Sequence, residues 1–248
     1  MKTAVSAALG TALLVGCSLN PARVPEAQPV PLFRKQGETR LAASMQHLKG
    51  VNVQAAAAVG EKVSLIAGGA YAQQDNCLSC SKEVARHVEL GLGSYQALEN
   101  GWVRELYAGA GVGRFKVSGN SGKFDPQTED IVVSGGKYRE AFLQANLGRN
   151  GSWIDQGVST RLSGSRFYDF GQWDGEGRAR SAPGRHWGVF LEPAYTLRLG
   201  YKEIKTETQI GFSLPVYQAQ GLDNQMLWIT VGLGLNLGRL HAENHEGR

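Results

Sequence analysis

Two cysteines have the spacing of a chemical motif. Cys77 and Cys80 form a C-x-x-C pair, which occurs in zinc sites, in redox dithiols and in short disulfide loops. A structural zinc ion needs four ligands, and His87 would supply only a third. A redox dithiol is expected inside a strand–helix–strand unit, which the surrounding sequence does not indicate. We therefore predict a disulfide between Cys77 and Cys80, formed outside the cytoplasm.

A second group of side chains has the types needed for hydrolysis at the rim of a barrel, as in omptin-type proteases. Its members are Asp169, Asp174, His186 and Asp223. Their spacing matches no motif, and no histidine stands in the His-x-Ser pair that a barrel-type lipid A deacylase uses. We therefore expect no enzyme, no catalytic residue, no cofactor and no metal, with a rim hydrolase as the lowest-ranked alternative.

The first 16 residues are typical of a secretion signal. Lys2 provides the positive charge, and the apolar run from Ala4 to Val15 is too short to span a membrane as a helix. Leu14-Val15-Gly16-Cys17 resembles the bacterial lipobox, in which a lipid is attached to the cysteine sulfur before cleavage. We predict lipidation of Cys17, and an ordinary signal peptide with an incidental cysteine remains the alternative.

Residues 17–36 contain prolines at positions 21, 25, 29 and 31. Closely spaced prolines favour an extended chain. We predict an unpacked tether that links the lipidated cysteine to the folded domain.

Residues 37–238 alternate between apolar and polar positions with a period of two, the pattern of β-strands with one apolar face. The segment 186–201 is the clearest example, and the 33 glycines of the chain suit tight turns and curved strands. The pattern predicts an all-β fold, an antiparallel up-and-down transmembrane β-barrel of about ten strands, with eight as the runner-up and a soluble β-sandwich as the alternative. Residues 239–248 are expected to form a polar tail. The ten candidate strands are 38–47, 51–59, 62–72, 84–97, 102–117, 137–148, 152–167, 186–200, 203–216 and 225–237.

Connections of two lengths follow these strands. Short ones are expected near Gly60, 100–101, 150–151 and 200–202, and long ones at 73–83, 118–136, 168–185 and 217–224. Outer-membrane barrels have short periplasmic turns and long extracellular loops. We therefore expect both termini in the periplasm and the lipid on Cys17 in the inner leaflet of the outer membrane.

Charged residues of both signs are predicted to face the lumen. A barrel of this size is narrow enough for such side chains to fill it, and buried charges must be paired or solvated. A salt-bridged plug is the preferred interpretation, with a narrow solute channel or a small-ligand transport barrel as alternatives. The predicted lumen residues are Glu89, Arg104, Arg114, Glu140, Asp155, Arg161, Glu192, Arg198, Lys205 and Glu207.

Aromatic residues near the strand ends are candidates for membrane-interface girdles. They are Trp102, Trp153, Trp187, Tyr201 and Trp228, although the alternation turns Trp228 inward. In the last strand, Thr230, Gly232, Leu235 and Leu237 resemble the β-signal that the barrel-assembly machinery recognises, although eleven residues follow it and no terminal aromatic closes the chain.

The lipobox, the proline-rich segment with Val30-Pro31-Leu32-Phe33, the Gly37-Glu38 pair and the glycine-rich strands together resemble the small lipid-anchored outer-membrane barrels of Bacteroidetes. The resemblance implies a location more than an activity. The net charge of +4 is spread along the chain, which argues against a nucleic-acid partner. We expect a non-enzymatic outer-membrane lipoprotein whose loops 118–136 and 168–185 contact an extracellular partner or support envelope integrity. Its expected partners are outer-membrane lipids and, during biogenesis, the assembly machinery.

Overall fold

The computed structural model describes residues 25–46, 50–76, 81–120, 131–173, 179–201, 203–219 and 224–238. The predicted lipidation site Cys17 and the predicted disulfide between Cys77 and Cys80 lie outside these residues. Asp174 and Asp223 of the rim group also lie outside them.

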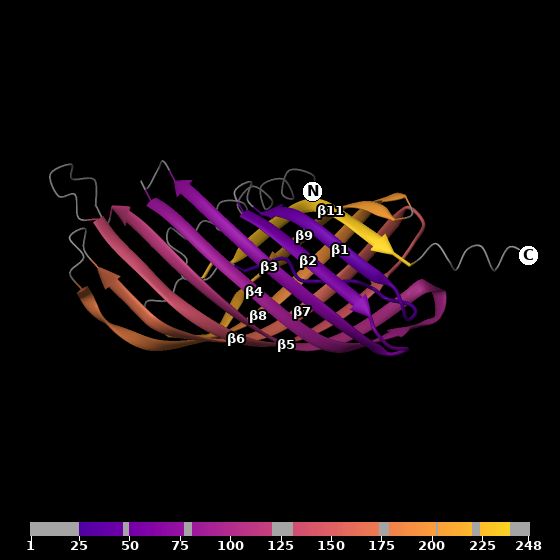
Figure 1. Ribbon diagram of the computed structural model, residues 1–248, viewed down its shortest axis with the longest axis horizontal. Helices are drawn as coiled ribbons and strands as arrows, with labels where there is room; N and C mark the ends of the chain where they lie inside the picture. Colours follow the sequence, from indigo (N-terminus) through magenta and orange to yellow (C-terminus); the bar gives the residue numbers. More distant parts are fainter. Residues whose placement is uncertain are drawn as a thin grey trace, which may run out of the picture.

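The described residues form a closed antiparallel β-barrel, as predicted (Figure 1). Its strands are β1 (Thr39–Gln46), β2 (Gly50–Ala58), β3 (Val63–Asn76), β4 (Ser81–Ala97), β5 (Trp102–Asn120), β6 (Ile131–Arg149), β7 (Ile154–Trp173), β8 (Ala179–Tyr201), β9 (Ile204–Phe212), β10 (Leu214–Gln218) and β11 (Leu227–Leu237). A short 3-10 turn, η1 (Glu99–Gly101), precedes β5. None of the described segments is a helix long and apolar enough to cross a bilayer.

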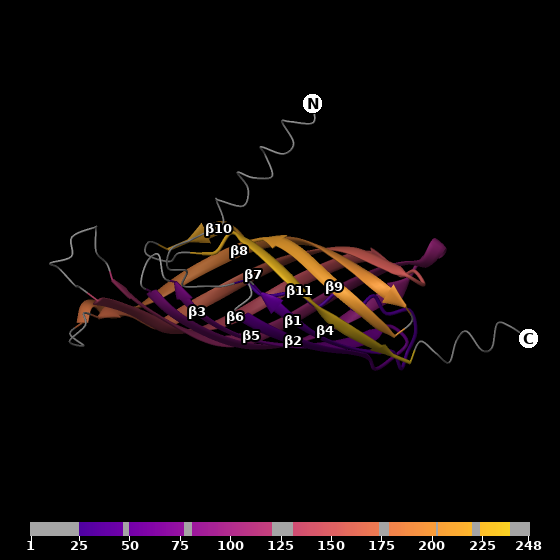
Figure 2. The same cartoon turned by 90° about the horizontal axis from the view of Figure 1, so that it is seen from above.

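Ten strands close the barrel, because β9 and β10 are two parts of one strand. Both pair with β8, in one register as far as Pro215, and only Ser213 separates them. β1 pairs with β11, from Thr39 opposite Leu237 to Gln46 opposite Thr230, which closes the sheet. Figure 2 shows β1, β11 and β9 side by side on one wall.

The two walls of the barrel differ in height. β1 and β2 have 8 and 9 residues, whereas β7 and β8 have 20 and 23. A tilted strand crosses a bilayer with about 9–11 residues, so β4 to β8 continue well beyond the membrane at the end away from the short turns. Within the predicted loops 118–136 and 168–185, residues 118–120, 131–136, 168–173 and 179–185 are strand instead.

The outward face carries an apolar band, which is the surface that lipid covers. On β5 the outward residues run from Leu106 to Val112, and Arg104 and Arg114 bound them on either side. The rings of Trp153 and Tyr201 pack together near the short turns, with centroids 4.7 Å apart. Trp228 is fully buried in the barrel and is no part of a girdle.

Candidate functional site in the lumen

The lumen holds the chain's own N-terminal segment, residues 25–36. At one end of this segment, the carbonyl of Pro25 accepts a hydrogen bond from Gln46 Nε2 (2.7 Å) at the end of β1. At the other, Gly37 N donates to Ala58 O (2.9 Å), and β1 begins two residues later. The unpacked tether is therefore wrong for residues 25–36: Val30, Leu32 and Phe33 are at most 1 % exposed. We call residues 25–36 the plug.

Side chains on the lumen wall form hydrogen bonds with the backbone N–H and C=O groups of the plug. Buried peptide groups need hydrogen-bond partners, so this pairing specifies where the segment lies. Gln209 bonds both the N–H and the carbonyl of Gln28, at 2.7 and 3.0 Å. Further contacts join Gln54 to Ala27 O, Gln144 and Asn146 to Pro29 O, Asn150 to Leu32 O, and Glu105 to Phe33 N.

Glycines on the wall make room for the apolar side chains of the plug. A Cβ at Gly148 would lie 2.7 Å from the side chain of Leu32, and one at Gly157 would lie 3.2 Å from Val30. Phe33 packs in a buried cluster with Tyr95, ring centroids 5.9 Å apart, and with side chains of β2, β3, β5 and β6. The fit between wall and plug is therefore steric as well as polar.

Two ion groups lie in the half of the lumen near the short turns. Glu207 lies between Arg40 and Arg198, at 2.5 Å from each, and Arg198 also donates to the carbonyl of Val30. Lys205 pairs with Asp155 at 2.7 Å. All five charged groups are buried, and pairing with an opposite charge offsets part of the cost of removing each from water.

Arg161 occupies the middle of the lumen. Its guanidinium donates to both carboxylate oxygens of Glu89 (2.7 and 2.9 Å) and to Gln144. It also lies 4.1 Å from the ring centroid of Phe142. A bidentate pair of this kind is the strong form of the arginine–carboxylate interaction.

His87 lies where the plug enters the lumen. Its Nδ1 is 2.7 Å from Glu26 Oε2, and its ring stacks on Tyr138 with centroids 5.6 Å apart. Ligand atoms of His87, Glu89 and Glu140 lie within 4.8 Å of one another. Glu89 is held by Arg161, and Glu140 accepts from Ser165 (2.7 Å), so internal contacts account for this cluster without a metal ion.

A histidine–carboxylate pair can also orient a general base. The Nε2 atom of His87 faces the wall at Gly111, where an added Cβ would touch it. Beyond it lies a buried cluster of Phe115, Val117, Tyr138, Phe167 and Phe170. The arrangement therefore fixes the plug in place and leaves His87 Nε2 facing backbone instead of a substrate.

Eight of the ten predicted lumen residues lie in the lumen, and Arg104 and Arg114 do not. Both point outward, because the inward positions of β5 are the odd ones that carry Glu105, Tyr107 and Phe115. Five further lumen residues were not predicted from the sequence: Glu26, Glu38, Arg40, His87 and Glu105. Hydrophobicity does not mark the inward face of β5, because apolar residues such as Val103, Tyr107 and Phe115 face the lumen.

The remaining predicted residues lie on β7, β8 and β11. Thr230 faces the lumen and Leu237 faces outward, as their alternation requires, with Gly232 and Leu235 between them. His186 packs edge-on against Phe170, with centroids 4.9 Å apart. The side chain of Asp169 is not described, and Asp174 and Asp223 lie outside the described residues. Of the four predicted rim residues, the described part of the structure therefore places only the side chain of His186.

The chain matches no protein-family model, and no curated protein matches it. Among solved structures, it is similar to the outer membrane protease OmpT from Escherichia coli, with a TM-score of 0.50, 10% identity, and coverage of 81% of this chain and 93% of that one. The translocator domain of the autotransporter NalP from Neisseria meningitidis also matches, with a TM-score of 0.38, 13% identity, and coverage of 80% and 86%. At 10% identity, the likeness to OmpT shows a shared fold, that of an outer-membrane barrel.

These findings contradict the prediction of a non-enzymatic barrel that acts through long extracellular loops. One of the similar solved structures is a protease, the class of function that was the lowest-ranked alternative from the sequence. Parts of the loops on which the prediction depended belong to strands, namely residues 118–120, 131–136, 168–173 and 179–185. The prediction of an outer-membrane β-barrel is confirmed.

Proposed function

We propose that this protein is a closed outer-membrane barrel that holds its own N-terminal segment across the membrane. One observation carries the proposal: residues 25–36 run through the lumen and are bonded to its wall along their length. The role of the barrel is then to carry the chain before Pro25 from the periplasmic end to the cell surface.

The end of β1 gives the level at which the plug enters. Gln46, which binds Pro25, is the last residue of β1. The exposed apolar side chains of Met45 and Val51 lie beside it on the outer face, at the end of the low wall away from the turn between β2 and β3. Gly37, by contrast, lies beside Ala58 and the turn between β2 and β3. If the short turns are periplasmic, Pro25 lies at the outer boundary of the membrane.

This geometry changes the proposed position of the lipid. Pro25 is eight positions after Cys17, and a fully extended chain of about eight residues spans at most about 29 Å. The low wall of the barrel, where β1 and β2 end, is next to the entry point. We therefore propose that a lipid on Cys17 inserts into the outer leaflet, instead of the inner leaflet that the sequence suggested.

Epitope accessibility in intact cells tests this proposal. One variant carries an epitope between Cys17 and Pro25, and its matched control carries the same epitope after Gly238, at the short-turn end. We expect antibody to bind the first epitope on intact cells and the second only after the outer membrane is permeabilised. If both epitopes need permeabilisation, the N-terminal segment does not reach the surface.

A further inference from the structure

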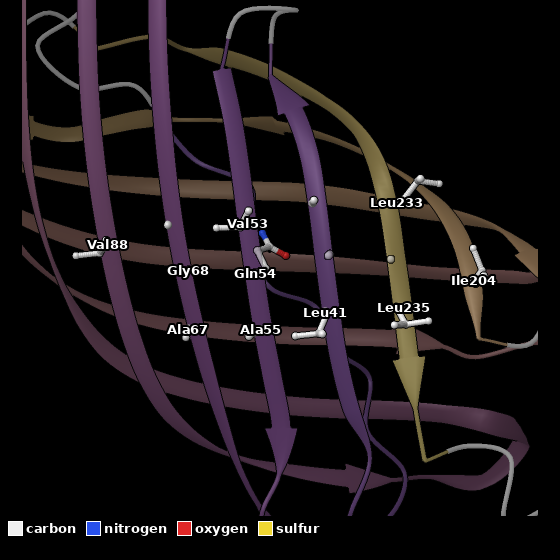
Figure 3. A pocket seen from close by; sticks show the side chains of 14 residues that line it. Leu41, Val53, Gln54, Ala55, Ala67, Gly68, Val88, Ile204, Leu233 and Leu235 are labelled. Carbon is white, nitrogen blue, oxygen red and sulfur yellow. The ribbon is translucent and has the colours of Figure 1, made fainter.

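An apolar groove lies on the outer face of the low wall (Figure 3). It has a volume of about 750 Å³ and extends over β1, β2 and β3, with β11 at one edge and β4 at the other. Among the residues that line it, only Gln54 has a polar side chain, and this side chain donates to Ala27 O of the plug (2.6 Å). The groove therefore offers hydrocarbon contacts on its membrane side.

Small outward residues form the floor of the groove. Ala55 on β2 lies directly opposite Ala67 on β3, and Gly69 follows on the same face of β3. Ala43 stands at an outward position of β1. A hydrocarbon chain on this floor would contact protein atoms on several sides, instead of the single side that a flat wall offers. Larger exposed side chains surround the floor: Leu41, Val53, Val88 and Leu233.

The plug begins directly behind this part of the wall. Pro25 O accepts from Gln46 at the end of β1, and Ala27 O accepts from Gln54 on β2. Ala43 is three positions before Gln46 on β1, which is a distance of about 10 Å along a strand. The chain that precedes Pro25 therefore meets the barrel at the rim of the wall that carries the groove.

The length of this preceding chain limits where a lipid on Cys17 can lie. Cys17 is eight positions before Pro25, a reach of at most about 29 Å. The hydrogen bonds from Gln46 and Gln54 fix the start of the plug on the low wall. A lipid on Cys17 is thereby kept close to β1 and β2, whereas the other lipids of the membrane are free to diffuse away.

We propose that the acyl chains attached to Cys17 occupy this groove, so that the lipid anchor packs against its own barrel. In a bilayer, association between apolar surfaces depends on van der Waals packing instead of on removal from water. A concave floor next to a tethered lipid favours such packing. The plug would then be held at both ends, by β1 after Gly37 and by the lipid before Pro25, which opposes its withdrawal toward the short turns.

This inference rests on the proposed function, because it needs a lipidated N-terminal segment that leaves the lumen over the low wall. The two can fail separately. Epitope accessibility reports whether the chain before Pro25 reaches the cell surface, whereas the experiment below reports what lies in the groove. A surface epitope together with a different occupant of the groove would overturn the inference and leave the proposed function intact.

Photocrosslinking in native membranes tests the inference. One variant of the full chain carries the photoreactive amino acid benzoylphenylalanine in place of Val53, at the edge of the groove. Its matched control carries it in place of Leu162, which is exposed on the outward face of β7, on the opposite side of the ring from β2. After irradiation, gel electrophoresis separates single chains from linked pairs, and mass spectrometry of the digested protein identifies the linked partner.

We expect position 53 to be joined to the acylated Cys17 peptide of the same chain. The yield should be at least about tenfold higher than from position 162, because a short tether does not span to the far side of the ring. Equal yields from the two positions would overturn the inference. So would a Cys17 peptide without acyl chains, or a product at position 53 that contains only free phospholipid or a second copy of the chain.

Filling the floor of the groove separates packing from mere proximity. In the chain with the probe at position 53, Ala55→Leu/Ala67→Leu is expected to lower the yield of the acylated product about tenfold, since roughly ten carbon contacts are lost. The matched control is Ala110→Leu/Ala141→Leu, which enlarges two exposed alanines that lie opposite each other on β5 and β6. It should leave the yield unchanged. Equal yields from the two double variants would overturn the inference.

Discussion

Arginines inside the barrel and arginines outside it are balanced in different ways. Inside, Arg161 donates hydrogen bonds to both carboxylate oxygens of Glu89, and Arg198 and Arg40 both pair with Glu207. Outside, Arg86, Arg114 and Arg139 lie opposite other basic residues in the sheet. The inner arginines are paired with buried carboxylates of the protein, whereas the outer arginines stand at exposed positions of the sheet. Removing an arginine should therefore have different consequences on the two faces.

The largest expected effect is on the inner face. Arg161→Leu would leave Glu89 buried without its cation, near Glu140, and we expect the free energy of unfolding to fall by about 3–5 kcal/mol. Urea unfolding of the barrel in phospholipid vesicles measures this loss. The matched control is Arg114→Leu on the outer face, where about 0–1 kcal/mol is expected. Equal losses for the two variants would contradict the distinction between the faces.

A charge placed on the apolar band should cost less. Leu90 is 70% exposed on the outward face of β4, and Leu90→Arg would bring a cation into the hydrocarbon. We expect a loss of about 2–4 kcal/mol in the same unfolding measurement. Leu98→Arg, beside the short turn before β5, serves as the control with about 0–1 kcal/mol. If both substitutions cost the same, Leu90 is not at the centre of the membrane.

Glycine substitutions should also differ in effect between the inner and the outer face. An added Cβ at Gly113 would collide with the ring of Tyr138 in the lumen, whereas one at Gly164 would meet nothing within 4 Å. We expect Gly113→Ala to reduce the free energy of unfolding by about 1–3 kcal/mol. Gly164→Ala should change it by no more than about 0.5 kcal/mol. Thermal unfolding of the two variants is monitored by the change in gel mobility that accompanies unfolding of the barrel. A larger effect at Gly164 than at Gly113 would show that the lumen is not tightly packed at Gly113.

The smallest effect is expected at the short-turn boundary. Arg104 bonds Gln96 on the exposed surface, and exposed polar contacts contribute little. Arg104→Gln should leave the free energy of unfolding within about 0.5 kcal/mol of wild type. A loss above about 2 kcal/mol would indicate that Arg104 contacts the lumen network after all.

Most of the barrel could be predicted from the sequence, because a period of two in hydrophobicity follows directly from the geometry of a strand. The short turns and the final strand are examples: Leu227 to Leu237 alternate as the barrel requires. Strand length was harder to predict, since β7 and β8 leave the membrane and lose the apolar face that marks a strand. On β5, apolar residues such as Val103 and Tyr107 face the lumen, so hydrophobicity alone did not identify its outer face.

The plug could not be predicted because its signal lies on other strands. Val30, Leu32 and Phe33 are apolar in a segment whose prolines favour an extended chain, which fits a tether as well as a buried segment. What distinguishes the two is the complementary wall: Gly148 beneath Leu32, and Gln209, Gln144 and Asn146 beside the plug backbone. These residues are far from the plug in sequence, so only the closed barrel brings them together.

Electrical conductance in planar bilayers tests most directly whether the plug closes the lumen. We expect the wild-type barrel to give no steady single-channel current, and a variant lacking residues 25–36 to conduct ions once its β-structure has been verified by circular dichroism. Where that deletion does not fold, Gln144→Ala/Asn146→Ala, which removes two bonds to Pro29, is expected to give brief openings. A steady current through the wild type, or a folded deletion variant as silent as the wild type, would contradict the account.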